Sequence, residues 1–165
     1  MAMQATIRLA APTDRDAIIA ILFNTFETTW RPQISEAAAQ AFIDENRPAS
    51  YFAERGHLFW VCELNGVVAG FVDWHGDFVN ALHVRDVHSR TGFGTVLMDK
   101  AEAEIAKDGF SQARLETDTF NQISQAFYKK RGFIETDRYP DHEWNSDLVT
   151  VLMVKPLSKK RQAVS

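Results

Sequence analysis

The stretch LHVRDVHSRTGFGT, residues 82–95, decides the fold. An apolar strand ends at Val84, a polar loop follows, and two glycines stand where a helix must begin. Glycine lets the backbone turn tightly and approach a ligand, because no Cβ is in the way. The N–H groups at a helix N-terminus are unsatisfied donors at the positive end of the helix dipole. The stretch therefore predicts a site for a phosphate or a pyrophosphate.

Two common nucleotide-binding patterns do not fit this stretch. A Walker loop needs a lysine and then a serine or threonine, but Gly94 is followed by Thr95. A dinucleotide-binding fingerprint needs a third small residue three positions after Gly94, where Leu97 stands. Both patterns are excluded.

The segments before this stretch predict a strand, two helices and an antiparallel meander. A strand is expected over 6–9, followed by a helix that begins with a capping box of Thr13 and Asp16. Its apolar positions recur at helical spacing: Ile18, Ile21, Leu22 and Phe26. A second helix is expected to open at Ser35. Strands are predicted over 58–64, 67–74 and 78–84, with Asn65-Gly66 as the first hairpin turn and Gly76-Asp77 as the second.

The segments after it continue as alternating helices and strands. Phe93, Leu97, Ala101 and Ile105 form one stripe of a helix that ends at Asp108-Gly109. A helix is predicted over 124–131 and ends at Gly132. It lies between a strand over 114–117 and a strand over 133–138, and a last strand is predicted over 148–155. The whole order predicts an α/β fold with a mixed, mostly antiparallel sheet of about six to seven strands and about four flanking helices.

Two motifs resemble the GNAT superfamily of N-acetyltransferases. The family pattern Arg/Gln-x-x-Gly-x-Gly/Ala after a strand is matched by SRTGFG, residues 89–94, except that Ser89 stands where the family has Arg or Gln. Asn121, Tyr128 and Gly132-Phe133 match the family's Asn-x(6)-Tyr-x(3)-Gly-Phe segment in spacing. The order of elements agrees from Thr6 to Lys155, so the resemblance covers nearly the whole chain.

The resemblance implies acetyl-CoA as the cosubstrate and direct attack by a primary amine of a small molecule or peptide. It implies that backbone groups of Leu82 and Val84 hold the pantetheine arm and stabilise the oxyanion that forms on the thioester. Tyr128 matches the family's general acid, which protonates the departing thiolate. The expected coenzyme-binding residues are Leu82, His83, Val84, Ser89, Arg90, Thr91, Gly92, Phe93, Gly94, Thr95, Asn121 and Tyr128.

The general base stays open. Some family members use a Glu on the strand that leads into the glycine loop, but the corresponding neighbourhood here contains Asn80, which cannot act as a base. The candidates near predicted strand ends are Asp73, His75, Glu116 and Asp118, and a water chain is the alternative.

The acceptor also stays open. Acidic residues in the segments expected around it favour a cationic amine, namely Glu27, Asp77, Asp141, Glu143 and Asp147. Two other functions compete with a small-molecule enzyme: a non-catalytic acyl-CoA sensor, which would not need Tyr128, and a protein N-terminal acetyltransferase. Three aromatic residues either line the acceptor pocket or pack in the core, namely Phe26, Trp30 and Trp74.

Composition excludes several classes of protein. The net charge of −4 offers no general attraction to nucleic acid or to an anionic membrane, so neither is an expected partner. A single cysteine, Cys62, fits a core position in a reducing compartment, and a cytoplasmic location is expected. The histidines lack zinc spacing, so no metal site is expected. We expect one acetyltransferase domain over 1–157, a disordered basic tail over 158–165 and, because many family members dimerise, a homodimer.

Overall fold

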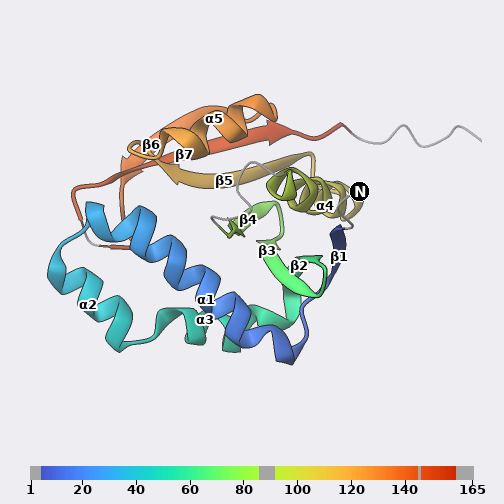
Figure 1. Cartoon of the computed structure of the whole chain (residues 1–165). Coiled ribbons are helices and arrows are strands. Elements are labelled where there is room, and N and C mark those ends of the chain that lie inside the picture. The colour runs from blue at the N-terminus through green and yellow to red at the C-terminus, as the bar shows by residue number, and fades with distance from the viewer. Residues whose placement is uncertain (1–4, 86–91, 145, 159–165) are drawn as a thin grey trace, which may run out of the picture. The chain divides into compact units, whose positions relative to one another are not determined.

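The structure, a computed structural model, describes residues 5–85, 92–144 and 146–158 (Figure 1). The hairpin at Asn65-Gly66 is confirmed: both turn residues have positive φ, 51° and 82°. It joins β2 (Trp60–Leu64) to β3 (Val67–His75) in antiparallel register. Asn and Gly tolerate this left-handed backbone, which explains why the sequence turns here.

The strands form one mixed sheet of seven. Its order is β1-β2-β3-β4-β5-β7-β6, with β1 (Ala5–Leu9), β4 (Phe78–Val84), β5 (Gln112–Asp118), β6 (Ile134–Pro140) and β7 (Val149–Pro156). The turn at Gly76-Asp77 joins neighbouring strands with two residues, which permits only antiparallel pairing of β3 with β4. β4 and β5 run parallel, and the pairs β1–β2, β5–β7 and β6–β7 are antiparallel. The predicted sheet is confirmed.

The part of the chain that the structure describes contains five α-helices, one more than expected. They are α1 (Arg15–Thr25), α2 (Glu36–Asp44), α3 (Arg47–Arg55), α4 (Phe93–Lys107) and α5 (Gln122–Lys130). Short helical turns complete the N-terminal third: η1 (Pro12–Asp14), the π-helical η2 (Phe26–Trp30), η3 (Arg31–Gln33) and η4 (Gly56–Leu58). The sequence analysis missed α3, although Asn46 caps it, with its side chain accepting from Ala49 N, and Pro48 lies in its first turn.

The backbone groups into two compact units, residues 1–73 with 81–98, and residues 74–80 with 99–165. In the first unit α1 packs against α3 (Figure 1), and α1 places Ile18 and Ile21 in an apolar cluster with β2 and β3. Phe59 and Phe71 stack at the centre of this cluster with ring centroids 4.7 Å apart. The predicted apolar face of the first helix is confirmed.

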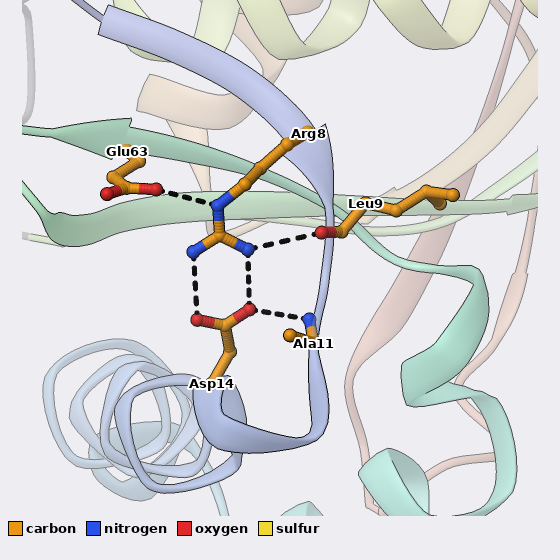
Figure 2. Close-up of polar contacts among 5 residues, drawn as sticks. All are labelled: Arg8, Leu9, Ala11, Asp14 and Glu63. Atoms are coloured by element: carbon orange, nitrogen blue, oxygen red, sulfur yellow. Dashed lines mark hydrogen bonds and ion pairs between the residues drawn. The ribbon is translucent and has the colours of Figure 1, made fainter.

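The start of α1 differs from the predicted capping box. Asp14, and not Thr13 with Asp16, provides the side-chain bond, because its carboxylate accepts from Ala11 N at 2.7 Å. Figure 2 shows that the same carboxylate binds Arg8 of β1 through two bonds, at 2.7 and 3.0 Å, and that Arg8 also reaches Glu63 of β2. The ion pair with Arg8 lowers the pKa of Asp14. This network ties the first strand to the first helix.

A second polar cluster in the first unit fixes the end of β3. The carboxylate of Asp73 is fully buried and accepts from the Tyr51 hydroxyl at 2.6 Å. Arg55 donates to both of its oxygens, at 2.8 and 2.9 Å. Because both donors lie on α3, the helix missing from the sequence analysis is the one that anchors this strand end.

In the second unit α5 lies against β5 (Figure 1). The C-terminal end of α5 is linked to α4 by Arg131, which donates to Asp99 at 2.8 Å and to Glu102 at 2.6 Å. Lys155 of β7 also binds Glu102. Gly132 follows α5 with a φ of 100°, which confirms the predicted stop.

Candidate active site

The first part of the predicted site lies in the first unit, where β4 passes β3. Arg85, the residue after β4, donates its backbone N–H to Ala69 O of β3 at 2.8 Å. The chain is therefore still hydrogen-bonded to β3 where β4 ends. A Cβ on Gly70 would lie 2.5 Å from the carbonyl oxygen of His83 and 3.1 Å from Cα of Val84. Gly70 is therefore required by the close approach of the backbone that the sequence assigns to the pantetheine arm.

The side chain of His83 belongs to the packing of this unit. Its ring stacks on Phe71 at 5.3 Å, and its Nδ1 lies 3.1 Å from Oγ1 of Thr25 on α1. Burial lowers the pKa of His83 to about 4, so the ring is neutral at physiological pH. His83 is thus a partly buried, uncharged imidazole that packs within this unit.

The glycine loop is described only from Gly92 onward; Ser89, Arg90 and Thr91 lie outside the described residues. Gly92 has a φ of 89°, and its carbonyl accepts the first helical bond, from Val96 N at 3.1 Å. Apart from the chain neighbours of Gly92, no atom of the described residues lies within 4 Å of the point where a Cβ would stand. Gly92 directly precedes the 15-residue helix α4, and Phe93, Gly94 and Thr95 form the first turn of that helix.

Asn121 and Tyr128 lie in the second unit. Asn121 directly precedes α5, and Tyr128 lies on that helix. Asn121 is the N-cap of α5, because its side-chain oxygen accepts from Ser124 N at 3.1 Å. Its amide nitrogen makes no hydrogen bond with the residues that the structure describes, and it remains a donor for a ligand.

Tyr128 is a buried phenol on α5. Its ring packs edge-on against Phe127 and Phe133, with centroids 5.2 and 5.6 Å away, and only 9% of the residue is exposed. Within the described ranges no group hydrogen-bonds to its hydroxyl. Burial raises the pKa of Tyr128 further above its ordinary value of 10, although the charge of Arg131 opposes this. The phenol therefore carries its proton at neutral pH and can act as an acid.

The four candidate bases differ sharply in their surroundings. Both carboxylate oxygens of Asp73 accept hydrogen bonds, from Tyr51 and Arg55. His75 is exposed at the end of β3. Glu116 is also exposed, on β5.

Asp118, the last residue of β5, is the exception among these candidates. It is 5% exposed, and its side chain makes no hydrogen bond to any residue that the structure describes. Burial, and after it the negative charges of Asp141, Glu143 and Glu116, together raise the pKa of Asp118 to about 7. Asp118 therefore exchanges its proton near neutral pH.

The acidic residues that suggested a cationic acceptor are largely committed elsewhere. Glu27 pairs with Arg31 at 2.7 Å, and Asp77 pairs with Arg114 at 2.9 Å. The carboxylate of Asp141 accepts three bonds within its own loop, from the backbone of Glu143 and Trp144 and from Ser146. Their presence in the sequence is thus explained by structure.

Two further findings concern the residues in 5–85, 92–144 and 146–158. They contain no group of three or more His, Cys, Asp or Glu side chains that could hold a metal ion. They also include no helix with the length and apolar character needed to cross a membrane. Cys62 is buried in β2, as predicted.

Known proteins resemble this chain in both sequence and fold. An N-acetyltransferase of Mycobacterium bovis that is named as uncharacterized is 26% identical over 130 residues, which cover 73% of this chain and 83% of the relative. The PaiA N-acetyltransferase of Thermoplasma acidophilum, solved with coenzyme A, superposes with a TM-score of 0.75 at 20% identity, over 93% of this chain and 99% of that one. YncA of Salmonella typhimurium, a putative acetyltransferase solved with acetyl-CoA, superposes with a TM-score of 0.68 at 25% identity. The superposition covers 95% of this chain and 96% of that one.

A family model extends this likeness from individual proteins to a family. The model described as "Acetyltransferase (GNAT) family" matches residues 19–133, which include the glycine loop, Asn121 and Tyr128. Since that match spans well over half of the chain, the protein belongs to the GNAT acetyltransferase family and is an acetyl-CoA-dependent acetyltransferase.

Proposed function

We propose that the protein transfers the acetyl group of acetyl-CoA to a primary amine of a small molecule or a peptide. The observation that carries this proposal is the state of Tyr128, whose ring is buried while its hydroxyl has no partner among the described residues. A hydroxyl that serves only the fold would be expected to bond to a neighbour. A protonated phenol held ready for a ligand suits a general acid.

The coenzyme would be held by backbone more than by side chains. Gly92 and the first turn of α4 supply N–H groups and open space for the pyrophosphate. Backbone groups of Leu82 and Val84 would hold the pantetheine arm, and the amide nitrogen of Asn121 would donate to the coenzyme. Acetyl-CoA then supplies an acetyl group that is activated as a thioester.

Two protons leave the acceptor nitrogen in this reaction, and one proton reaches the departing sulfur. The acceptor is an ammonium ion at neutral pH and must lose a proton before its nitrogen can attack. The nitrogen bonds to the thioester carbon and loses a second proton to solvent, the carbon–sulfur bond breaks, and Tyr128 donates its phenolic proton to the departing sulfur. Solvent returns a proton to Tyr128, so that the enzyme is regenerated.

The experiment is a comparison of two tyrosine variants with the same chemical change. Tyr128→Phe should lower turnover by roughly 10²- to 10⁴-fold while acetyl-CoA still binds, because a proton donor is lost. Tyr51→Phe should keep its turnover, because its hydroxyl serves only the buried Asp73. Release of the free thiol from acetyl-CoA is measured with a panel of primary amines.

The outcome also separates the competing functions. Equal turnover of Tyr128→Phe and the wild type with a true acceptor would remove Tyr128 from the mechanism. Acetyl-CoA binding without transfer to any amine or peptide would favour the non-catalytic sensor. Transfer to peptide N-termini in preference to free amines would favour a protein N-terminal acetyltransferase.

A further inference from the structure

His83 on β4 has two ring nitrogens, and the described residues provide a partner for one of them. Nδ1 lies 3.1 Å from Oγ1 of Thr25 on α1. No described residue bonds to Nε2, the nitrogen farther from the backbone, and Nε2 is not among the fully enclosed side-chain atoms that lack a hydrogen-bond partner. Since His83 is partly exposed, Nε2 keeps surface that a ligand can reach.

The hydroxyl of Thr25 decides which ring nitrogen carries the proton. A threonine hydroxyl has one hydrogen to donate. Within the parts of the chain that the structure describes, the acceptor for that hydrogen is Nδ1 of His83. If Nδ1 carried the ring proton instead, it would donate to Thr25 Oγ1, and the hydroxyl hydrogen would be left without an acceptor there. The satisfied arrangement therefore has Thr25 donating to Nδ1 and the ring proton on Nε2.

This arrangement makes His83 a hydrogen-bond donor and not a base. Burial lowers the pKa of His83 to about 4, so the ring carries a single proton at neutral pH. Nε2 holds that proton, and the lone pair of Nδ1 accepts from Thr25. A neutral imidazole N–H suits an oxygen that gains negative charge, because the hydrogen stays on the nitrogen.

The ring of His83 is held in place by the core of the first unit. It stacks on Phe71 with ring centroids 5.3 Å apart, and Phe71 stacks on Phe59 at 4.7 Å. The backbone of His83 lies so close to β3 that a Cβ on Gly70 would stand 2.5 Å from its carbonyl oxygen. A donor whose ring and backbone are both fixed is preorganised, as the stabilisation of a transition-state charge requires.

We propose that Nε2–H of His83 donates a hydrogen bond to the carbonyl oxygen of the acetyl thioester. This inference rests on the proposed function, which assigns the backbone of Leu82 and Val84, on either side of His83, to the pantetheine arm that carries the thioester. The acceptor nitrogen bonds to the thioester carbon while the π electrons of the C=O bond move onto the oxygen. The Nε2–H bond stays intact and stabilises this oxyanion until the C=O bond re-forms and the carbon–sulfur bond breaks.

Binding measurements test this contact without any turnover. Acetyl-CoA and S-ethyl-CoA differ at the acyl group only by the carbonyl oxygen. His83→Phe keeps an aromatic ring against Phe71 and removes the N–H. In calorimetric titrations without an amine, His83→Phe should weaken binding of acetyl-CoA roughly 2- to 10-fold, as expected for one lost hydrogen bond. Its affinity for S-ethyl-CoA should equal that of the wild type.

Two results of these titrations would overturn the proposal. Equal losses for acetyl-CoA and S-ethyl-CoA would mean that Nε2 serves another part of the coenzyme. No loss for either ligand would mean that Nε2 bonds to water alone. His57→Phe is the matched control, because His57 is an exposed histidine in η4, and both of its affinities should equal those of the wild type.

Kinetics distinguish a donor to the oxyanion from a residue that only supports the fold. His83→Phe should lower kcat roughly 10²- to 10³-fold, as expected for one lost oxyanion donor, and leave KM for the amine unchanged. Thr25→Val, which cannot donate to Nδ1, should also lower kcat, and Thr25→Ser should restore it. An unchanged kcat of His83→Phe would refute the donor alone. A wild type that binds acetyl-CoA through its carbonyl oxygen but acetylates no amine would refute the proposed function and leave this contact standing.

Discussion

Replacing Asp118 by asparagine should stabilise the protein at alkaline pH and have little effect in acid. The carboxyl is 5% exposed, and its pKa is raised from an ordinary value of 3.8 to about 7 by burial and by three neighbouring negative charges. Asparagine has the same shape and cannot ionise. The variant therefore removes only the cost of a buried charge.

The size of the effect follows from the difference in proton affinity. A pKa of about 7 in the folded protein against 3.8 in the unfolded chain corresponds to about 4 kcal/mol. Between pH 3.8 and about pH 7 the Asp118 carboxyl binds more protons in the folded state than in the unfolded state. The wild type therefore has its full stability below pH 3.8 and loses it as the pH rises toward 7. Between about pH 5 and pH 8 the loss is roughly 2.5 kcal/mol.

The assay is urea unfolding of wild type, Asp118→Asn and Asp108→Asn at several pH values across this window. The free energy of unfolding of Asp118→Asn relative to wild type should increase by roughly 2.5 kcal/mol from about pH 5 to pH 8. Asp108→Asn should show no such trend, because that side chain is exposed. A constant difference between Asp118→Asn and wild type would show that Asp118 titrates normally, and the argument for a buried, unbonded carboxyl would fail.

Three further changes test other parts of the structure. Gly70→Ala places a Cβ 2.5 Å from the carbonyl oxygen of His83, so it should cost roughly 1–3 kcal/mol and weaken acetyl-CoA binding; unchanged melting and affinity would show that β4 is not held there. Asp14→Asn should cost roughly 2–4 kcal/mol at neutral pH, measured by urea unfolding, because Arg8 loses one of its two carboxylate partners and keeps only Glu63. The pKa of Asp14 is lowered, so its contribution is present above the ordinary value of 3.8 and fades as the pH falls below it; a deficit that persists in strong acid would contradict the ion pair. Tyr51→Phe should lower stability by about 1–3 kcal/mol, since a buried carboxylate loses a donor, and an unchanged melting temperature would count against that bond.

Much of the fold could be predicted because local signals and tertiary structure agree. Asn65-Gly66 specifies a hairpin by its backbone conformation, and the apolar stripe of α4 marks its buried face. The helix α3 could not be recognised in the same way, since Pro48 and a short, mostly polar segment predict a loop as readily. That helix is stabilised by contacts distant in sequence, in particular the bonds from Tyr51 and Arg55 to Asp73.

The candidate site was predictable only in part, for a different reason. Gly92, Asn121 and Tyr128 belong to spaced motifs, and spacing is visible in a sequence. Whether a carboxylate is paired is not visible, since its partner comes from another element. Asp73 and Asp118 are both strand-end aspartates, yet one is held by two donors and the other has none among the described residues.

The account's central claim is that this chain binds acetyl-CoA in order to use it. Calorimetric titration of the purified protein with acetyl-CoA tests that claim most directly, with Tyr128→Phe as a variant that should bind equally well. We predict saturable binding at one site per chain, weakened when Gly92 is replaced by a bulky residue that would fill the open space beside it. A folded sample that takes up no acetyl-CoA would contradict the account.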